Sequence, residues 1–188
     1  MVRITSGLYK GRKLRVPRVG VRPTKVMVRE ALFSALGDSL IGKRMADLFA
    51  GSGAVGLEAL SRGVGEAWWV EEEERTFDLL KQNVGMIDPS LTTTCLRMDS
   101  FAWLKSTFSP VGLDFVFADP PYRPPDGERS WGERLLEALA VSPALKPEGL
   151  FVLEQRHNQP VIDNPAFSML KFKEYGESML VYYRKHSS

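Results

Sequence analysis

The chain has 188 residues, of which 44% are hydrophobic and 26% are charged, which fits one globular domain and argues against a disordered chain. No apolar run approaches the roughly 20 residues of a transmembrane helix, and the first residues lack the apolar stretch of a signal peptide, so we expect a cytoplasmic protein without membrane contact. One cysteine, Cys95, and two histidines exclude an internal disulfide and a Cys/His zinc cluster, and no metal is expected.

The net charge of +2 conceals an uneven distribution of charge along the chain. Residues 1–44 contain 11 lysines and arginines against 2 acidic residues, whereas residues 45–188 contain 14 against 21. A basic N-terminal segment on a mildly acidic domain favours a polyanionic partner, because Lys and Arg neutralise phosphates. A solvated basic hairpin without a partner is the alternative, and composition does not separate RNA from DNA.

The N-terminal segment is predicted to form a hairpin, because β-prone runs at Arg3–Ser6 and Arg12–Val16 flank a short turn. Arg22-Pro23-Thr24 then interrupts the chain, with Thr24 as a candidate helix N-cap. Apolar residues at helical spacing follow and predict a helix that ends at Gly37. We therefore divide the chain into a basic hairpin arm, residues 1–23, and a main domain, residues 24–188.

Short apolar runs alternate with helical stretches from Gly42 onward. The predicted strands are Met45–Phe49, Ala67–Val70, Thr92–Met98, Leu113–Ala118 and Leu150–Leu153. The predicted helices are Ala54–Arg62, Glu73–Val84, Ser100–Ser106 and Trp131–Ala140. This alternation predicts an α/β fold with a mostly parallel twisted sheet and helices on both faces. Ala166–Glu174 and Met179–Tyr183 predict an antiparallel C-terminal hairpin at the sheet edge, followed by a frayed tail at Arg184–Ser188.

A glycine-rich loop, Asp47 to Gly56, lies where the first predicted strand of the main domain becomes a helix. Gly51 and Gly53 allow positive φ and a close approach of backbone to ligand, and Gly56 lets the helix pack on the strand. A tight structural turn is the alternative, but the order of strand, loop and helix favours a nucleoside cofactor. Glu71 ends the second predicted strand, where it can accept hydrogen bonds from ribose hydroxyls, while the acidic residues after it suit a helix N-terminus.

The segment Asp119-Pro120-Pro121-Tyr122 follows a buried strand and therefore leaves the sheet at its carboxyl edge. The prolines have no N–H and an ionised aspartate only accepts, so the segment offers acceptors alone. Such a patch suits an exocyclic amine, which donates two hydrogen bonds, and Tyr122 offers a ring on which a planar base can stack. A plain Asp-Pro-Pro turn is the alternative.

These two motifs together resemble S-adenosylmethionine-dependent amino-methyltransferases. With Arg22-Pro23-Thr24 and Val28–Phe33 added, the chain from Ile4 to Tyr183 resembles the RsmD family, bacterial methyltransferases of a guanine N2 in 16S ribosomal RNA. The resemblance implies a Rossmann-like class I methyltransferase fold, S-adenosylmethionine as cofactor, 16S rRNA or the small ribosomal subunit as partner, and a monomer. Met27 stands where the family usually has a basic residue, which would weaken one contact to RNA.

The resemblance also assigns roles to individual residues. The cofactor site would be formed by Asp47, Ala50, Gly51 and Gly53 around the methionine part, Glu71 at the ribose, and Asp99 and Ser100 at the adenine. Asp99 also fits an N-cap of the next helix, and the two roles are compatible. Asp119 and the Pro120 carbonyl would hold the amine, with Tyr122 against the base. The RNA contacts would be Arg3, Lys10, Arg12, Lys13, Arg15 and Arg18 on phosphates, with Arg22 and Arg29 near the active site.

Other functions remain open from the residues alone. A DNA adenine-N6 methyltransferase shares both motifs, although this chain has no room for a sizeable target-recognition domain. An NAD-dependent dehydrogenase shares the glycines and Glu71 but leaves the Asp-Pro-Pro-Tyr segment and the arm unexplained. A non-catalytic RNA-binding module fits the arm but needs no glycine loop. Arg129 and Trp131 are expected in a solvated loop, and Trp69 and Trp103 in the core.

Overall fold

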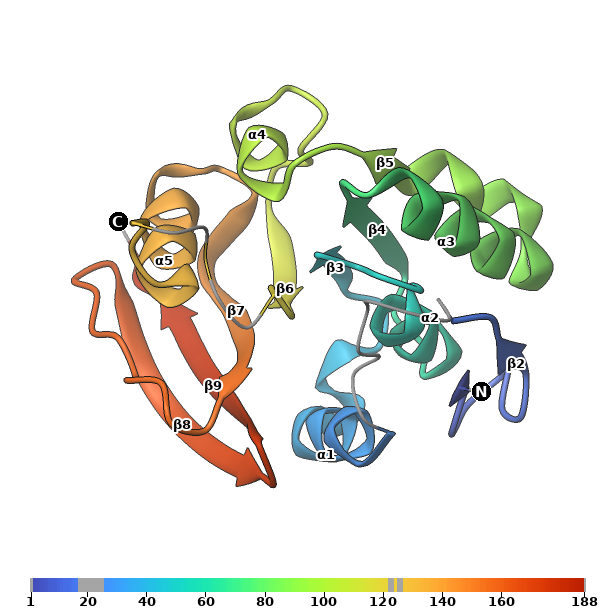
Figure 1. Ribbon diagram of the computed structural model, residues 1–188, viewed down its shortest axis with the longest axis horizontal. Coiled ribbons are helices and arrows are strands. Elements are labelled where there is room, and N and C mark those ends of the chain that lie inside the picture. Colours follow the sequence, from blue (N-terminus) through green and yellow to red (C-terminus); the bar gives the residue numbers. More distant parts are fainter. Residues whose placement is uncertain (1, 17–25, 122–123, 125–126, 188) are drawn as a thin grey trace.

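The computed structural model describes residues 2–16, 26–121, 124 and 127–187, and these ranges contain a small sheet and a large one (Figure 1). The small sheet pairs β1 (Val2–Arg3) with β2 (Lys13–Leu14) in antiparallel fashion. The large sheet has the order β5-β4-β3-β6-β7-β9-β8. Its strands are β3 (Arg44–Leu48), β4 (Glu66–Glu71), β5 (Cys95–Arg97), β6 (Leu113–Ala118), β7 (Leu145–Arg156), β8 (Phe167–Tyr175) and β9 (Ser178–Lys185).

The first five strands of the large sheet run parallel, and β9 and β8 add an antiparallel hairpin at one edge. The predicted α/β fold with a C-terminal hairpin is thus confirmed. The order of the strands reverses between β3 and β6, which are hydrogen-bonded neighbours. In open α/β sheets, ligands bind outside the carboxyl ends of the strands at such a reversal.

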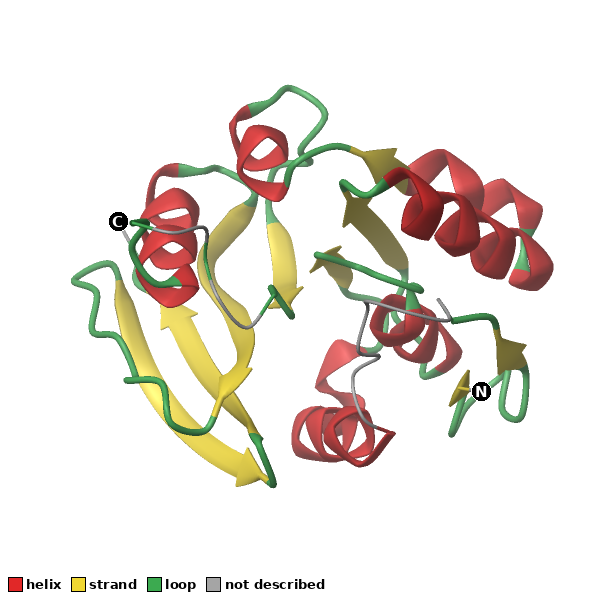
Figure 2. Ribbon diagram, in the orientation of Figure 1, coloured by secondary structure: helices red, strands yellow, loops and turns green. Residues whose placement is uncertain are grey.

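Helices cover both faces of the large sheet, as Figure 2 shows. The helical segments are α1 (Val26–Leu36), η1 (Gly37–Leu40), α2 (Ala54–Ser61), α3 (Glu74–Ile87), η2 (Pro89–Thr94), α4 (Ser100–Lys105) and α5 (Trp131–Val141). Apolar residues of α1, α2 and α3 bury one face, and those of α4 and α5 bury the other. Successive residues of β3 alternate between these faces, Met45 to the first and Ala46 to the second, as strand geometry requires.

Several predicted boundaries differ from the structure. The predicted strand Leu150–Leu153 is part of the longer β7, and the two predicted strands of the arm are shorter, at Val2–Arg3 and Lys13–Leu14.

Two further differences have a clear physical reason. The predicted strand Thr92–Met98 begins three residues late, at Cys95, because Pro89–Thr94 forms a 3₁₀-helix. The predicted frayed tail is wrong at Lys185, which is buried at the end of β9. Its ammonium donates to the carbonyls of Leu139, Ser142 and Leu145 at 2.8, 2.9 and 3.1 Å. The last carbonyls of a helix have no partner within the helix, and this ammonium supplies donors at the end of α5.

Candidate active site

The glycine loop joins β3 to α2 at the reversal of strand order. Phe49, Gly51 and Gly53 all have positive φ, at 58°, 55° and 78°. A Cβ built on Gly53 would lie 2.5 Å from Leu80 Cδ1, and one on Gly56 would lie 2.2 Å from the Trp69 indole nitrogen. Neither position can hold a side chain, because the loop and the start of α2 press against α3 and β4. The predicted role of Gly56 in helix–strand packing is confirmed.

Two carboxylates hold the backbone of this loop. Asp47, at the end of β3, is buried and accepts a hydrogen bond from Gly56 N at 3.0 Å. Glu71, at the end of β4, accepts from Gly51 N at 2.8 Å through Oε2 and from Glu73 N at 2.9 Å through Oε1. Glu73 is itself the N-cap of α3, as the acidic run predicts. Glu71 therefore ties the loop to the neighbouring strand, a contact that sequence reasoning did not foresee.

Burial raises the pKa of both carboxyl groups. It raises the pKa of Asp47 to about 8, opposed by the Gly56 N–H and assisted by the charge of Glu71. Burial also raises the pKa of Glu71, although hydrogen bonds from Glu73, Gly51 and Glu72 oppose that shift. The loop is therefore held by a pair of acidic groups that interact unfavourably when both are ionised.

The raised pKa of Asp47 predicts a pH-dependent stability. A group whose pKa is higher in the folded state stabilises the protein below its unfolded pKa, near 4, and this contribution is lost as the pH rises toward about 8. We expect the unfolding free energy of the wild type, relative to Asp47→Asn, to fall by up to about 1.4 kcal/mol per pH unit in this window. Urea unfolding of both proteins at pH 5, 6, 7 and 8 measures the difference, and parallel pH profiles would contradict the expectation.

The Asp-Pro-Pro segment lies beside the glycine loop. β6 ends at Ala118, which pairs with Leu48 in β3, and Asp119 N donates to the Leu48 carbonyl at 3.5 Å. Pro120 is buried and Pro121 is exposed. The structure thus brings Asp119, Pro120 and the glycine loop to one edge of the sheet, while the predicted Tyr122 lies outside the described residues.

Asp99 and Ser100 lie at the start of α4, next along the same edge. Asp99 is the N-cap of α4 and accepts from Ala102 N at 2.8 Å through Oδ1, so its predicted capping role is confirmed. Oδ2 is the oxygen that a ligand would use in the second predicted role. Ser100 is buried in the first turn of the helix.

An aromatic cluster, Phe49, Phe101 and Trp131, connects the glycine loop to α4 and α5. Phe101 stacks on Trp131 with centroids 6.0 Å apart, and Phe49 meets both rings edge-on at 6.4 and 5.4 Å. The Arg134 guanidinium lies 4.4 Å from the Phe101 centroid and 4.8 Å from that of Trp131. Arg129 lies in an exposed loop, as expected, and pairs there with Glu137. Trp131 instead begins α5, which confirms the predicted helix Trp131–Ala140 and not the solvated loop for this residue. The capping box formed by Ser130 and Glu133 was the sequence signal for this helix start.

The basic arm packs against α2 and α3, as Figure 1 shows. Its apolar side chains Ile4 and Leu14 are buried in the core. Five of the residues predicted to contact phosphates lie in the described part of the arm, and all five are exposed, namely Arg3, Lys10, Arg12, Lys13 and Arg15. Arg18 and Arg22 lie outside the described residues, as does the predicted boundary between arm and main domain.

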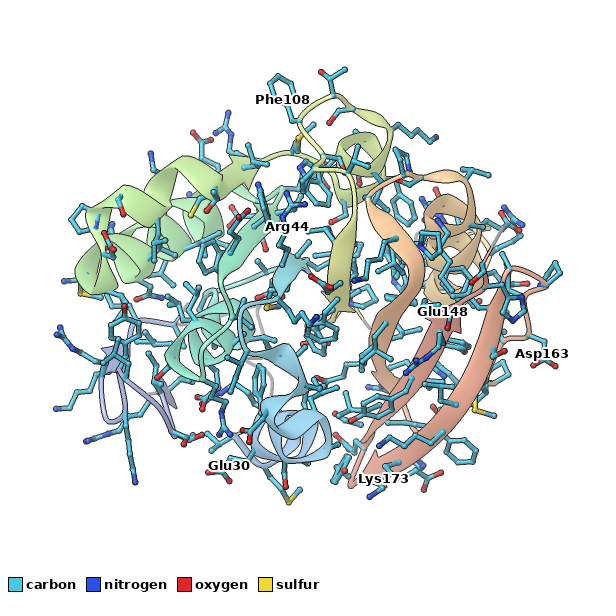
Figure 3. All side chains as sticks on the ribbon, turned by 180° about the vertical axis from the view of Figure 1, so that it is seen from behind. Glu30, Arg44, Phe108, Glu148, Asp163 and Lys173 are labelled. Carbon is cyan, nitrogen blue, oxygen red and sulfur yellow. The ribbon has the colours of Figure 1, made fainter. Side chains whose placement is uncertain are left out.

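The predicted contact of Arg29 with RNA is wrong, because the structure buries this side chain fully. Its Nε lies 3.4 Å from Glu58 Oε2, and its Nη2 donates to the carbonyl of Arg3 at 2.5 Å. Burial lowers the pKa of Arg29, and the Glu58 carboxylate opposes that shift. The next residue, Glu30, points outward from α1 in Figure 3. Arg29 therefore attaches the arm to the main domain.

The described ranges offer neither a membrane-spanning helix nor a metal centre. No helix in them is both long and apolar enough to cross a membrane. Within the same ranges, no three His, Cys, Asp or Glu side chains are placed to hold a metal ion.

Comparison with known proteins identifies relatives that this chain matches over most of their length. The family model described as conserved hypothetical protein 95 matches residues 2–184. The ribosomal RNA small subunit methyltransferase D of Haemophilus influenzae is 32% identical over 100% of this chain and 94% of its own length. The solved structure of the Escherichia coli methyltransferase yhhF is 29% identical, with a TM-score of 0.84 over 100% of this chain and 99% of that one.

A more distant structure shares the fold. It is an RNA methyltransferase from Salinibacter ruber in complex with S-adenosyl-L-homocysteine, 12% identical. Its TM-score is 0.65, with coverage of 89% of this chain and 95% of that one. The Rossmann-like methyltransferase fold is therefore confirmed.

Proposed function

The chain belongs to the conserved hypothetical protein 95 family, the RsmD family of methyltransferases, and from this we propose that it methylates the exocyclic N2 amine of a guanine in small-subunit ribosomal RNA. The cofactor is S-adenosylmethionine. The observation that carries the proposal is the place of Asp119 and Pro120, directly beside the glycine loop at the reversal of strand order. The antiparallel hairpin of β9 and β8 also argues against a dinucleotide dehydrogenase, whose sheet ends with a sixth parallel strand.

The residues at this edge fit S-adenosylmethionine. Gly53 and Gly56 have no room for a Cβ on the side of Leu80 and Trp69, so the loop backbone lies close against α3 and β4 and its position at the sheet edge is fixed. The acidic groups Asp47, Glu71 and Asp99 end three neighbouring strands or the turns after them. Asp47 holds the loop that would take the methionine part, and Glu71 and Asp99 suit the ribose hydroxyls and the adenine amine of this molecule. When bound, the cofactor supplies a methyl group carried on a sulfonium.

The acceptor segment prepares the amine of the substrate. The lone pair of a guanine amine is delocalised into the ring, so the free amine is a weak nucleophile. The Asp119 carboxylate and the Pro120 carbonyl hold its two hydrogens and direct the lone pair toward the methyl group. Asp119 need not be a strong base, because the amine becomes cationic on methylation and then loses its proton readily. Catalysis in this site comes chiefly from positioning and preorganised dipoles.

The proposal is tested by methyl transfer from tritium-labelled S-adenosylmethionine. Substrates are small ribosomal subunits from cells that lack the protein, the naked RNA extracted from them, and duplex DNA. We expect incorporation into one guanine of the small-subunit RNA, mapped by digestion and mass spectrometry as N2-methylguanine. Methylation of adenine in DNA, or of another position of the base, would contradict it.

The exposed side chains of the arm should control the salt dependence of RNA binding. Arg12→Gln and Lys13→Gln remove charge without touching the buried residues of the arm. The logarithm of the RNA association constant falls linearly with the logarithm of the salt concentration. For each phosphate contact that a substitution removes, we expect this slope to become shallower by about 0.7–0.9. Filter binding from 50 to 300 mM KCl measures the slope, and Lys171→Gln on β8 is the control. An unchanged slope in the arm variants would contradict the assignment.

A further inference from the structure

The side-chain amide of Asn83 joins the basic arm to the glycine loop. Asn83 lies on α3 and is fully buried. Its Oδ1 accepts from Arg15 N at 2.9 Å, and its Nδ2 donates to the Arg15 carbonyl at 2.9 Å and to the Ser52 carbonyl at 2.8 Å. Both N–H groups of the amide are used, one for each segment. A single side chain thus fixes two segments that are more than 30 residues apart in sequence.

The chemistry of these contacts requires an amide. Asn83 bonds both the N–H and the carbonyl of Arg15, as a neighbouring β-strand would, and this needs a donor and an acceptor on one short side chain. An aspartate could accept from Arg15 N, but when ionised it would donate to neither carbonyl. The arrangement therefore specifies asparagine at a position that lies among apolar residues of α3, Leu80 and Val84.

At the loop end, Asn83 holds the backbone that forms the proposed cofactor site. Ser52 lies between Gly51 and Gly53 and is buried. Leu80, one turn before Asn83 on α3, abuts Gly53, and Gly51 is bonded to Glu71. A displacement of Asn83 is therefore transmitted to the loop, which has no spare room on this side.

At the arm end, Asn83 holds the backbone that carries basic side chains. Arg15 is exposed and its Nη1 donates to Gln82 Oε1 at 2.6 Å, while the neighbouring Lys13 is also exposed. Phosphates that bind these side chains act on the same stretch of backbone that Asn83 bonds. The two ends of the amide thus face the two proposed ligands, through Arg15 toward RNA and through Ser52 toward the cofactor.

We propose that Asn83 is a positioning residue that couples RNA binding on the arm to cofactor binding at the glycine loop. The inference rests on the proposed function, because it needs both ligands. Either ligand restricts the motion of the backbone segment that Asn83 bonds. The other ligand then binds with a smaller loss of conformational entropy. By linkage, RNA raises the affinity for the cofactor by the same factor by which the cofactor raises the affinity for RNA.

The coupling is measured with S-adenosylhomocysteine, which permits no turnover. Equilibrium dialysis gives its Kd with and without saturating small ribosomal subunits from cells that lack the protein. We expect a ratio of about tenfold in the wild type, within the usual range of such couplings. In Asn83→Ala and Asn83→Asp we expect the ratio to approach one. Gln82→Ala, which removes a hydrogen bond to the arm but none to the loop, should keep the wild-type ratio.

The ratio of the two Kd values for S-adenosylhomocysteine, without and with subunits, distinguishes a coupling role of Asn83 from a merely structural one. A variant that only loosens the protein weakens both affinities and leaves their coupling unchanged. A wild-type ratio of one, or a full ratio in Asn83→Ala, would overturn the inference while both ligands still bind, so the proposed function would stand. Absence of any subunit binding by the wild type would overturn both.

A second measurement needs no variant, in case the Asn83 substitutions prevent folding. Subunits added to the wild-type protein without cofactor should slow amide hydrogen exchange in residues 49–56, and S-adenosylhomocysteine alone should slow it in residues 12–16. Unchanged exchange in both segments, with both ligands bound, would overturn the coupling.

Discussion

Asp119→Ala is expected to lower the rate of methyl transfer at saturating substrate by about 10³-fold or more. Asp119 directly follows β6 and sits beside the Leu48 carbonyl, where its carboxylate would receive the substrate amine. Removal of this acceptor takes away a contact that positions the lone pair in the transition state. The Kd for S-adenosylmethionine should change by less than about threefold, because Asp119 addresses the substrate and not the cofactor.

Two further variants serve as a graded comparison and a control for Asp119→Ala. Asp119→Asn keeps one acceptor oxygen and should retain more activity than Asp119→Ala. Asp114→Asn alters the opposite end of the same strand, where Asp114 contacts Lys43 and Lys146, and should leave transfer unchanged. Single-turnover rates and calorimetric titration with cofactor measure the two quantities. Near-normal turnover in Asp119→Ala would contradict the proposed role of Asp119 in holding the substrate amine.

Glu58→Ala is expected to cost about 3–5 kcal/mol of unfolding free energy. The fully buried Glu58 carboxylate accepts from Thr5 N, Thr5 Oγ1, Ser6 N and Arg62 Nε, at 2.7 to 3.1 Å, and faces the buried Arg29. Without it, the Arg29 charge stays in the core with no anion, and the donors of the arm lose their acceptor. The cost of an uncompensated buried charge exceeds that of a broken surface pair.

The control for Glu58 is an exposed ion pair. Glu66→Ala removes the partner of Arg44 at the surface and should change the unfolding free energy by no more than about 1 kcal/mol. Urea unfolding followed by circular dichroism measures both. Limited proteolysis should also cut the arm of Glu58→Ala sooner than that of the wild type, since its anchor is gone. A loss below about 1 kcal/mol in Glu58→Ala would show that the network adds little.

Much of the fold follows from the periodicity of the sequence. The apolar run Leu113–Ala118 coincides with β6, and the helix from Ala54 ends within one residue of its predicted end. These elements are fixed by local pattern, since a buried parallel strand and an amphipathic helix have different periods. Because parallel strands share one carboxyl edge, the motifs that follow the predicted strands also placed the glycine loop and Asp119 at one edge.

The contacts between distant segments could not be read from the sequence. Arg29 lies one turn before the buried Phe33 in α1, so its position on an apolar stripe was a signal for a buried charge. Its partner Glu58 is 29 residues away and only the packed structure identifies it. Asn83 and Lys185 show the same limit, because their partners are backbone groups that no sequence pattern marks.

The packing of Trp69 against the glycine loop gives the protein an internal optical reporter. The indole is fully buried, and its nitrogen has no hydrogen-bond partner within the described ranges, so its fluorescence should be emitted at short wavelength. Because the ring lies against Gly53 and Gly56, small changes in the loop alter the surroundings of the excited state. In a variant with Phe in place of the three other tryptophans, Trp68, Trp103 and Trp131, emission from this chromophore would follow the loop in real time without an attached dye.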